Sequence, residues 1–143
     1  MIAAEKVAEA LGGERVLGAP VRRLDELERL VHGRLPVAAL QALVAAGRLS
    51  PAEVKAHLVP ATTYARRARG GALSVAESER AERLARVIAT AEEVFLDRGR
   101  AHRWLRAAHP ELAGRTPLET AAGELGARRV EGLLWEIAHG IPA

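Results

Sequence analysis

The side chains best suited to chemistry gather in a basic segment between Arg48 and Gly71. The segment carries one acidic residue, Glu53, against five basic ones: Arg48, Lys55, Arg66, Arg67 and Arg69. Its positive excess is larger than the +3 net charge of the whole chain. Such a concentration of guanidinium and ammonium groups is typical of proteins that contact phosphates. A solvated helix end would carry the same charges, so charge alone leaves both interpretations open.

Residue sets for catalysis or metal binding are missing from the sequence. The chain has no cysteine, which excludes thiol chemistry, disulfides and thiolate metal sites. His102, His109 and His139 lack the spacing of metal ligands, and no glycine-rich phosphate loop is present. Ser74 and Ser78 are explained as residues at a helix start. We therefore expect a binding protein without enzymatic activity, cofactor or metal.

Two short helices are predicted to position the basic segment. Ser50-Pro51-Ala52-Glu53 combines a capping residue, a first-turn proline and a capping-box glutamate, which together begin a helix. That helix ends near Leu58, because Pro60 interrupts it, and a second helix is predicted from Ala61 to Arg69. Two short helices joined by a tight turn, the second one basic, indicate a DNA-binding helix-turn-helix at about residues 50–69.

The second of these helices supplies most of the candidate DNA contacts. Its first turn is expected to reach base edges, and its arginines suit phosphates or guanine. The candidate DNA-binding residues are Lys55, Thr62, Thr63, Tyr64, Arg66, Arg67 and Arg69. A purely structural helix pair is the alternative, in which Thr62 and Thr63 cap the helix and Tyr64 packs inward.

The rest of the chain is also predicted to be helical, which makes the fold class all-α. Apolar residues make up 49% of the chain and aromatic residues only 3%, so a core of Ala, Leu and Val is expected. Gly70-Gly71 is the clearest break, and it divides a helical N-terminal region, residues 1–71, from a second domain, residues 72–143. The other predicted elements are a loop or brief extended piece from Arg15 to Arg23, a long helix from Ser74 to Phe95, and a last helix from Ala127 to His139 that follows Gly126.

The sequence shows no sign of membrane insertion or export. No apolar run is long enough to span a membrane. Glu5 and Lys6 stand where a signal peptide would be apolar. The absence of cysteine fits a reducing compartment, so we expect a cytoplasmic protein.

The last predicted helix has two different faces. Val130, Leu133, Leu134 and Ile137 share one side and form a core stripe. Trp135 lies roughly 140° around the axis from Val130, at about 100° per residue. A large aromatic side chain away from the apolar stripe indicates contact either with a partner or with a neighbouring helix of the same domain.

The second half of the chain also carries an ordered series of motifs. They are Leu73-Ser74-Val75-Ala76-Glu77-Ser78-Glu79-Arg80, Leu84-Ala85-Arg86-Val87, Ala91-Glu92-Glu93-Val94-Phe95, Ala101-His102-Arg103-Trp104-Leu105, Gly114-Arg115-Thr116-Pro117-Leu118, Gly126-Ala127-Arg128-Arg129-Val130-Glu131, Leu133-Leu134 and His139-Gly140. This series, which spans nearly all of residues 73–140, resembles the Xre/MbcA/ParS-type antitoxin family. Upstream, residues 59–67 resemble the family's Xre-type recognition segment, with Thr62 where an arginine is common.

The resemblance implies an antitoxin that pairs with a RES-domain toxin, a toxin class that consumes NAD⁺. Residues 72–143 would then bind the toxin, block its active site with the last helix and the tail, and mediate homodimerisation. The N-terminal domain would bind operator DNA and repress the operon. Together with the two-faced helix, the resemblance gives these candidate toxin-binding residues: Arg128, Arg129, Trp135, Glu136, His139, Gly140 and Ile141. The alternative function is a stand-alone helix-turn-helix transcription regulator without a toxin partner.

Overall fold

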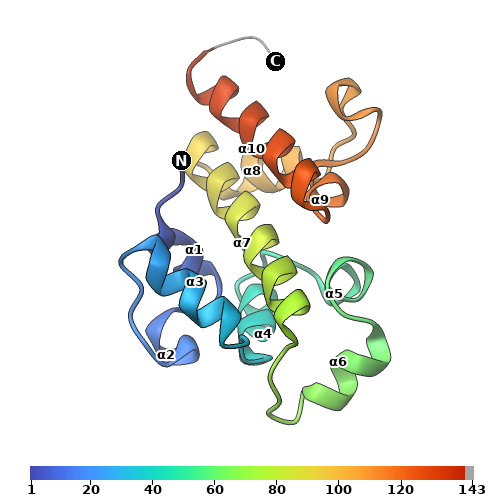
Figure 1. Ribbon diagram of the computed structural model, residues 1–143. Helices are drawn as coiled ribbons and strands as arrows, with labels where there is room; N and C mark the ends of the chain where they lie inside the picture. Colours follow the sequence, from blue (N-terminus) through green and yellow to red (C-terminus); the bar gives the residue numbers. More distant parts are fainter. Residues whose placement is uncertain (141–143) are drawn as a thin grey trace.

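Helices account for the regular structure of the chain. The computed structural model describes residues 1–140, and no strand forms within that range apart from an isolated bridge between Pro36 and Ala72. The all-α prediction is thereby confirmed. In order, the elements are α1 (Ala4–Ala10), α2 (Gly13–Leu17), α3 (Leu24–His32), α4 (Ala38–Ala45), α5 (Pro51–His57), α6 (Ala61–Arg67), α7 (Val75–Phe95), α8 (Arg98–Leu105), the 3₁₀ turn η1 (Pro110–Leu112), α9 (Pro117–Thr120) and α10 (Glu124–Ala138) (Figure 1).

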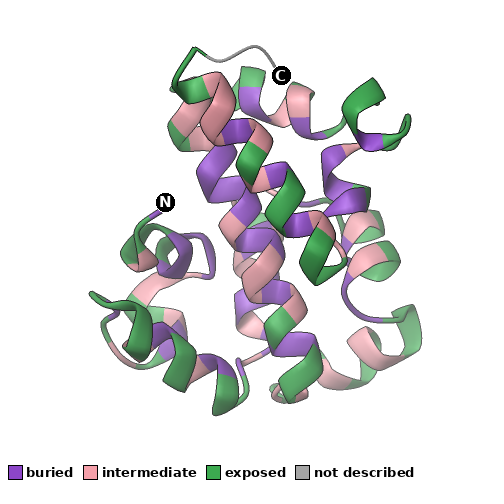
Figure 2. Ribbon diagram, turned by 45° about the horizontal axis from the view of Figure 1, so that its top comes forward, coloured by how far each residue is buried: buried purple, intermediate pink, exposed green. Residues whose placement is uncertain are grey.

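The long helix α7 is the axis of the molecule. The N-terminal helices α1 and α3 pack against it, and so do the C-terminal helices α8 and α10 (Figure 1). The predicted apolar stripe of this helix is buried at Leu84, Val87, Ile88 and Ala91, and half-buried at Phe95. Figure 2 shows buried ribbon along α7, while exposed ribbon marks the outer helices. Because both halves of the chain cover α7, one continuous apolar core joins them.

A capping box begins α7, as the sequence predicts. The Ser74 hydroxyl accepts a hydrogen bond from the backbone N–H of Glu77 at 3.1 Å, and the Glu77 carboxylate accepts one from the backbone N–H of Ser74 at 2.8 Å. One turn later, the buried Ser78 hydroxyl accepts a hydrogen bond from the backbone N–H of Leu35 at 2.8 Å. The two capping-box bonds satisfy backbone donors at the start of α7, and the Ser78 bond satisfies one in the segment before α4.

The segment between Gly71 and Leu73 is held against the N-terminal region. The backbone N–H of Leu73 donates to the Leu35 carbonyl at 2.8 Å, and that of Val37 donates to the Gly71 carbonyl at 3.0 Å. The Arg34 guanidinium adds a hydrogen bond to the Leu73 carbonyl at 2.7 Å. The backbone after the glycine pair is therefore paired on the N-terminal side before α7 begins.

Two predicted elements differ from the structure. The segment from Arg15 to Arg23 is not only loop, because α2 occupies its first part as a five-residue helix between left-handed Gly12 and Gly18. The last helix begins at Glu124 and not after Gly126. Gly126 lies inside this helix. A Cβ at this position would overlap the Thr120 carbonyl group, so only glycine allows α9 and α10 to approach this closely.

None of the helices in the described range is long and apolar enough to cross a membrane.

Candidate binding surfaces

The predicted helix pair is present as α5 and α6, joined by a three-residue turn. The Ser50 hydroxyl caps α5 by accepting a hydrogen bond from the backbone N–H of Glu53 at 3.1 Å, and the backbone N–H of Ser50 donates to the Glu53 carboxylate at 2.9 Å. The pair is held on the core by Val54, Leu58 and Val59, all of which are buried. The turn therefore has the apolar anchor that fixes one helix relative to the other.

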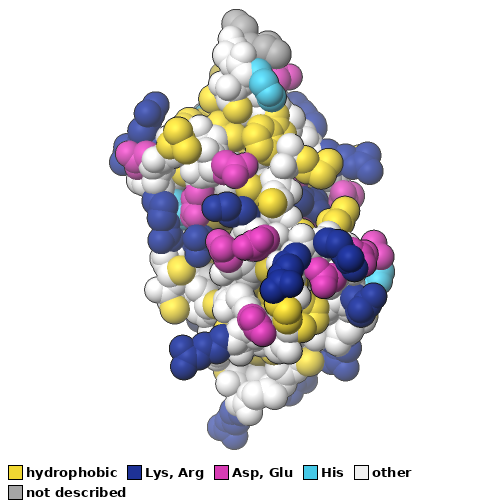
Figure 3. All heavy atoms as spheres, turned by 90° about the vertical axis from the view of Figure 1, so that its left-hand side faces the viewer, with side chains coloured by type: hydrophobic (Ala, Val, Ile, Leu, Met, Phe, Trp, Pro, Cys, Tyr) yellow, Lys and Arg dark blue, Asp and Glu magenta, His cyan; other side chains and the backbone are white. Residues whose placement is uncertain are grey.

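Helix α6 lies on the surface and has no buried residue. The side chains of Thr62, Arg66 and Arg69 are exposed, as is Lys55 on α5. Thr63 is half-buried, and Tyr64 is half-buried against the core. Acidic residues are absent from α6 and the turn after it. On the side of the molecule that carries α1 and α3, by contrast, acidic and basic side chains lie next to one another (Figure 3).

Arg67 differs from its neighbours on α6. Its guanidinium is paired with the carboxylate of Glu77, the residue that completes the capping box of α7. Both side chains are largely shielded from solvent, at 23% and 10% exposure. Arg67 therefore attaches α6 to the start of α7, and Arg66 and Arg69 are the arginines of this segment that project into solvent.

The C-terminal helix α10 is packed on its inner side, as predicted. Val130 and Leu134 are fully buried, and Leu133 and Ile137 are half-buried. At the start of the helix, Arg83 of α7 donates to the Ala122 carbonyl at 2.8 Å and pairs with Glu124 at 3.2 Å. These contacts hold α10 along α7.

The candidate toxin-binding residues of α10 are not equally available. The Arg128 side chain is 73% exposed, whereas the Arg129 guanidinium is hydrogen-bonded to the Glu111 carbonyl. Trp135 is half-buried and packs against the core, so the neighbouring helices take up part of its surface. The His139 ring bonds back to the Trp135 carbonyl at 2.6 Å. Glu136 is half-buried, His139 and Gly140 are exposed, and Ile141 lies outside the described residues.

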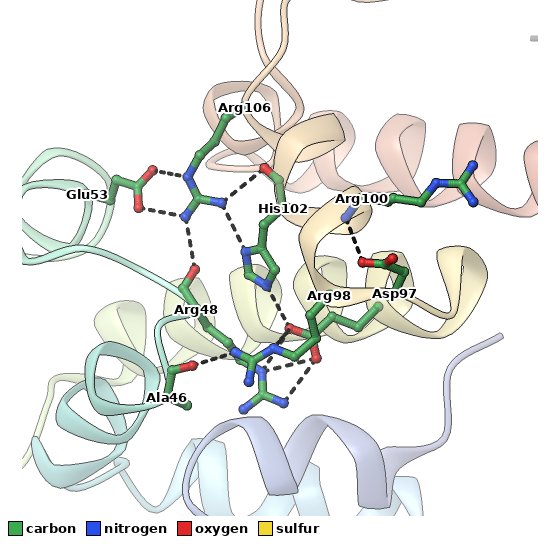
Figure 4. Close-up of polar contacts among 9 residues, drawn as sticks. Ala46, Arg48, Glu53, Asp97, Arg98, Arg100, His102 and Arg106 are labelled. Atoms are coloured by element: carbon green, nitrogen blue, oxygen red, sulfur yellow. Dashed lines mark hydrogen bonds and ion pairs between the residues drawn. The ribbon is translucent and has the colours of Figure 1, made fainter.

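A polar network connects the segment before α5 to α7 and α8 (Figure 4). The Arg48 guanidinium donates to both carboxylate oxygens of Glu92, with a shortest distance of 3.0 Å. Arg106 pairs with Glu53 at 2.9 Å and also donates to the Arg48 carbonyl at 3.1 Å. Burial alone would raise the pKa of Glu53, but the bond and charge of Arg106 hold it below its usual value.

Glu92 lies at the centre of this network. Burial would raise the pKa of Glu92, but hydrogen bonds from His102 and Arg48 outweigh it and lower the pKa to about 2. His102 Nδ1 lies 3.0 Å from the Arg106 guanidinium and Nε2 lies 2.8 Å from Glu92. Because arginine can only donate, Nδ1 must accept and the ring proton resides on Nε2, where it is donated to the carboxylate.

Sequence reasoning missed this network. It counted Arg48 among the charges available to phosphates, whereas the structure turns that side chain toward Glu92. Arg106 and His102 are far from Glu53 and Arg48 in the sequence, and no local spacing rule connects them. The predicted DNA contacts Thr62 and Arg66 are exposed on α6, and Arg69 is exposed in the turn after it, because the helix ends at Arg67 and not at Arg69 as predicted.

Both halves of the chain match known protein families. Residues 26–86 match the antitoxin Xre-like helix-turn-helix domain. Residues 90–140 match the antitoxin Xre/MbcA/ParS C-terminal toxin-binding domain. The chain belongs to the Xre/MbcA/ParS-type antitoxin family. In this antitoxin-family protein, α5 and α6 thus lie within the helix-turn-helix domain, and α8 to α10 form the C-terminal domain.

A relative in Pseudomonas putida supports the assignment. That protein, named Antitoxin Xre, is 37% identical over 95 residues. The alignment covers 66% of this chain and 59% of the relative, so the chain matches about three fifths of the relative's length.

Proposed function

We propose that this protein is an antitoxin that neutralises a cognate toxin through its C-terminal domain and represses its own operon through α6. The partner we propose is a RES-domain toxin that consumes NAD⁺, blocked at its active site by α10 and the tail. In this role the chain acts by binding and has no catalytic function of its own. The observation that carries the proposal is the pairing of a helix-turn-helix domain with a toxin-binding domain around one shared helix.

Exposed residues of α10 support toxin binding there. Arg128 is 73% exposed, and its ion pair with Glu124, one turn earlier on α10, is long at 3.7 Å. The end of the helix leads through His139 and Gly140 into the tail. An exposed arginine on a packed helix is suited to entering a cleft, because the helix holds it in place.

Toxin neutralisation can be tested by co-expression with the adjacent gene product. Val130 and Leu134 belong to the core, so removal of the whole helix would unfold the protein and would not inform about binding. We expect Arg128→Glu, and separately a chain that stops at His139, to lose neutralisation while their melting temperatures stay unchanged. Arg100→Glu, an exposed charge reversal on α8, serves as the control. If both variants neutralise the toxin as the natural chain does, the toxin site lies elsewhere.

Operon repression has its own test. We expect the protein to bind the DNA upstream of its coding region, and Arg66→Ala to weaken that binding and reduce its salt dependence. An unchanged salt slope would argue against a phosphate contact at Arg66. A chain that binds this DNA but no neighbouring gene product would be a stand-alone transcription regulator.

We also propose a homodimer formed through the C-terminal domain. Light scattering coupled to size exclusion would report the mass directly. A mass of 15.3 kDa at all concentrations would contradict the dimer.

A further inference from the structure

A shallow pocket opens at the turn between α5 and α6. Its volume is about 280 Å³, and its polar lining comes from Lys55, His57 and Arg80. Lys55 and His57 belong to α5, whereas Arg80 comes from α7, on the other side of the turn. No carboxylate lines the pocket.

Arg80 is unusual among the arginines of α7. Arg83 pairs with Glu124, and Arg86 pairs with Glu82 and Glu131. The Nε of Arg80, by contrast, is buried and has no hydrogen-bond partner among the described residues. Glu77, one turn earlier, is already engaged by Arg67 and the Ser74 backbone. Among the described residues, no carboxylate is paired with the Arg80 guanidinium, so its positive charge is available to an anion in the pocket.

The chemistry of the pocket fits an anion with several oxygen acceptors. A guanidinium fork and an ammonium group meet at an opening free of negative charge, which is the arrangement that binds phosphate. The pocket includes Pro60, the residue directly before α6. A backbone phosphate held there would fix the position of α6 on a duplex without reading its sequence.

We propose that this pocket binds a backbone phosphate of duplex DNA, with Arg80 and Lys55 as donors. The inference rests on the DNA binding proposed above. It extends the DNA surface from the helix-turn-helix to α7, a helix that also carries the C-terminal domain. It also gives the Arg80 guanidinium an anionic partner, which no carboxylate of the described residues provides.

The test is a salt titration of binding to two duplexes, one from upstream of the coding region and one of random sequence. We expect Arg80→Gln to weaken binding to both, by roughly five- to tenfold near 0.1 M salt, and to reduce the log–log salt slope by about 0.9. Arg80→Lys should keep most of the slope because it keeps the charge. Arg100→Gln removes an exposed charge on α8 and should change neither quantity.

The outcomes separate this proposal from the one on which it rests. If the natural chain binds neither duplex, both proposals are wrong. If it binds and Arg66→Ala weakens binding while Arg80→Gln leaves the slope unchanged, DNA binding stands and the pocket assignment is overturned. Should Arg80→Gln fail to fold, Lys55→Gln, an exposed substitution in the same pocket, must show the reduced slope. Inorganic phosphate that stabilises the natural chain but not Arg80→Gln, with DNA binding unaffected, would instead indicate a site for free anions and overturn the DNA assignment.

Discussion

Adjacent arginines of α6 have different surroundings and therefore different roles. Arg66 is exposed, while Arg67 neutralises a shielded Glu77 at the start of α7. Charge counting along the sequence treats the two as equal, because it cannot register a partner on another helix. A local basic cluster thus predicts where DNA could bind, but not which of its members are already engaged.

Replacing each of the two arginines should change the free energy of unfolding by a different amount. Arg67→Ala leaves the Glu77 carboxylate shielded and unpaired, so we expect a loss of about 1–3 kcal/mol in the free energy of unfolding. Arg66→Ala should stay within about 0.5 kcal/mol of the natural chain. Urea unfolding of the two variants makes the comparison. Equal stabilities would mean that the Arg67–Glu77 pair does not hold α6 in place.

The lowered pKa of Glu92 makes the stability of the fold depend on pH. A carboxyl whose pKa is lower in the folded chain than in the unfolded chain stabilises the fold when it is ionised. The contribution of Glu92 is therefore present above about pH 4.5 and is lost as the pH falls toward 2. With an allowance for solvent screening, we expect it to amount to about 1–2 kcal/mol.

The matching variant is Glu92→Gln, which cannot ionise. Measured in urea from neutral pH downward, the stability difference between the natural chain and Glu92→Gln should shrink as the pH drops below about 4.5. A difference that stays constant over this range would show that ionised Glu92 does not stabilise the fold.

At the scale of elements, capping residues made the helix starts predictable. Ser50 and Ser74, which the sequence indicates as helix starts, each form a capping box, and so does Thr116 at the start of α9. Gly126 misled the prediction, because a glycine required by close packing has the same local appearance as a glycine that ends a helix. The short helix α2 was missed since its five residues are too few for a periodic pattern.

Two glycines of α10 allow a direct test of this packing. Gly126→Ala would drive a methyl group into the Thr120 carbonyl, and we expect it to destabilise the protein by about 1–3 kcal/mol. Gly132 lies on the same helix with nothing within 4 Å of its Cβ position. Gly132→Ala should therefore stabilise the helix by up to about 1 kcal/mol. Thermal melts of both variants would test these expectations. If Gly126→Ala left the melting temperature unchanged, α9 and α10 would be able to move apart without loss of stability.

The pocket at Arg80 illustrates what the sequence could not provide. Its residues come from α5, the following turn and α7, and they meet only in the folded chain. The helix-turn-helix could be located because its signals are local, namely a cap, a proline and a run of arginines. The contribution of α7 to the same surface depends on packing between helices, which no spacing rule describes.

At the scale of the whole molecule, α7 belongs to both halves of the chain. The sequence suggests a boundary after Gly71, but α1 and α3 cover α7 as α8 and α10 do. A fragment of residues 72–143 would lose the cover of α1 and α3 and expose apolar surface. We expect such a fragment to lose most of the roughly 5–15 kcal/mol that typically stabilises a folded chain.

Urea unfolding and dye binding to exposed apolar surface would test this. The full chain should unfold in a single transition, with helix content and tryptophan fluorescence changing together. A fragment that unfolds as cooperatively as the full chain, without binding the dye, would instead establish residues 72–143 as an independent domain.

The placement of α6 and the end of α10 at opposite ends of the molecule (Figure 1) bears on how the proposed repression and the proposed neutralisation combine. A bulky protein docked on one end leaves the other end sterically open. Toxin and operator would then not compete for the antitoxin but would assemble with it into a ternary complex. In a gel-shift experiment, added toxin should slow the DNA band further and should not release the DNA, so the level of toxin could tune repression without dismantling the repressor.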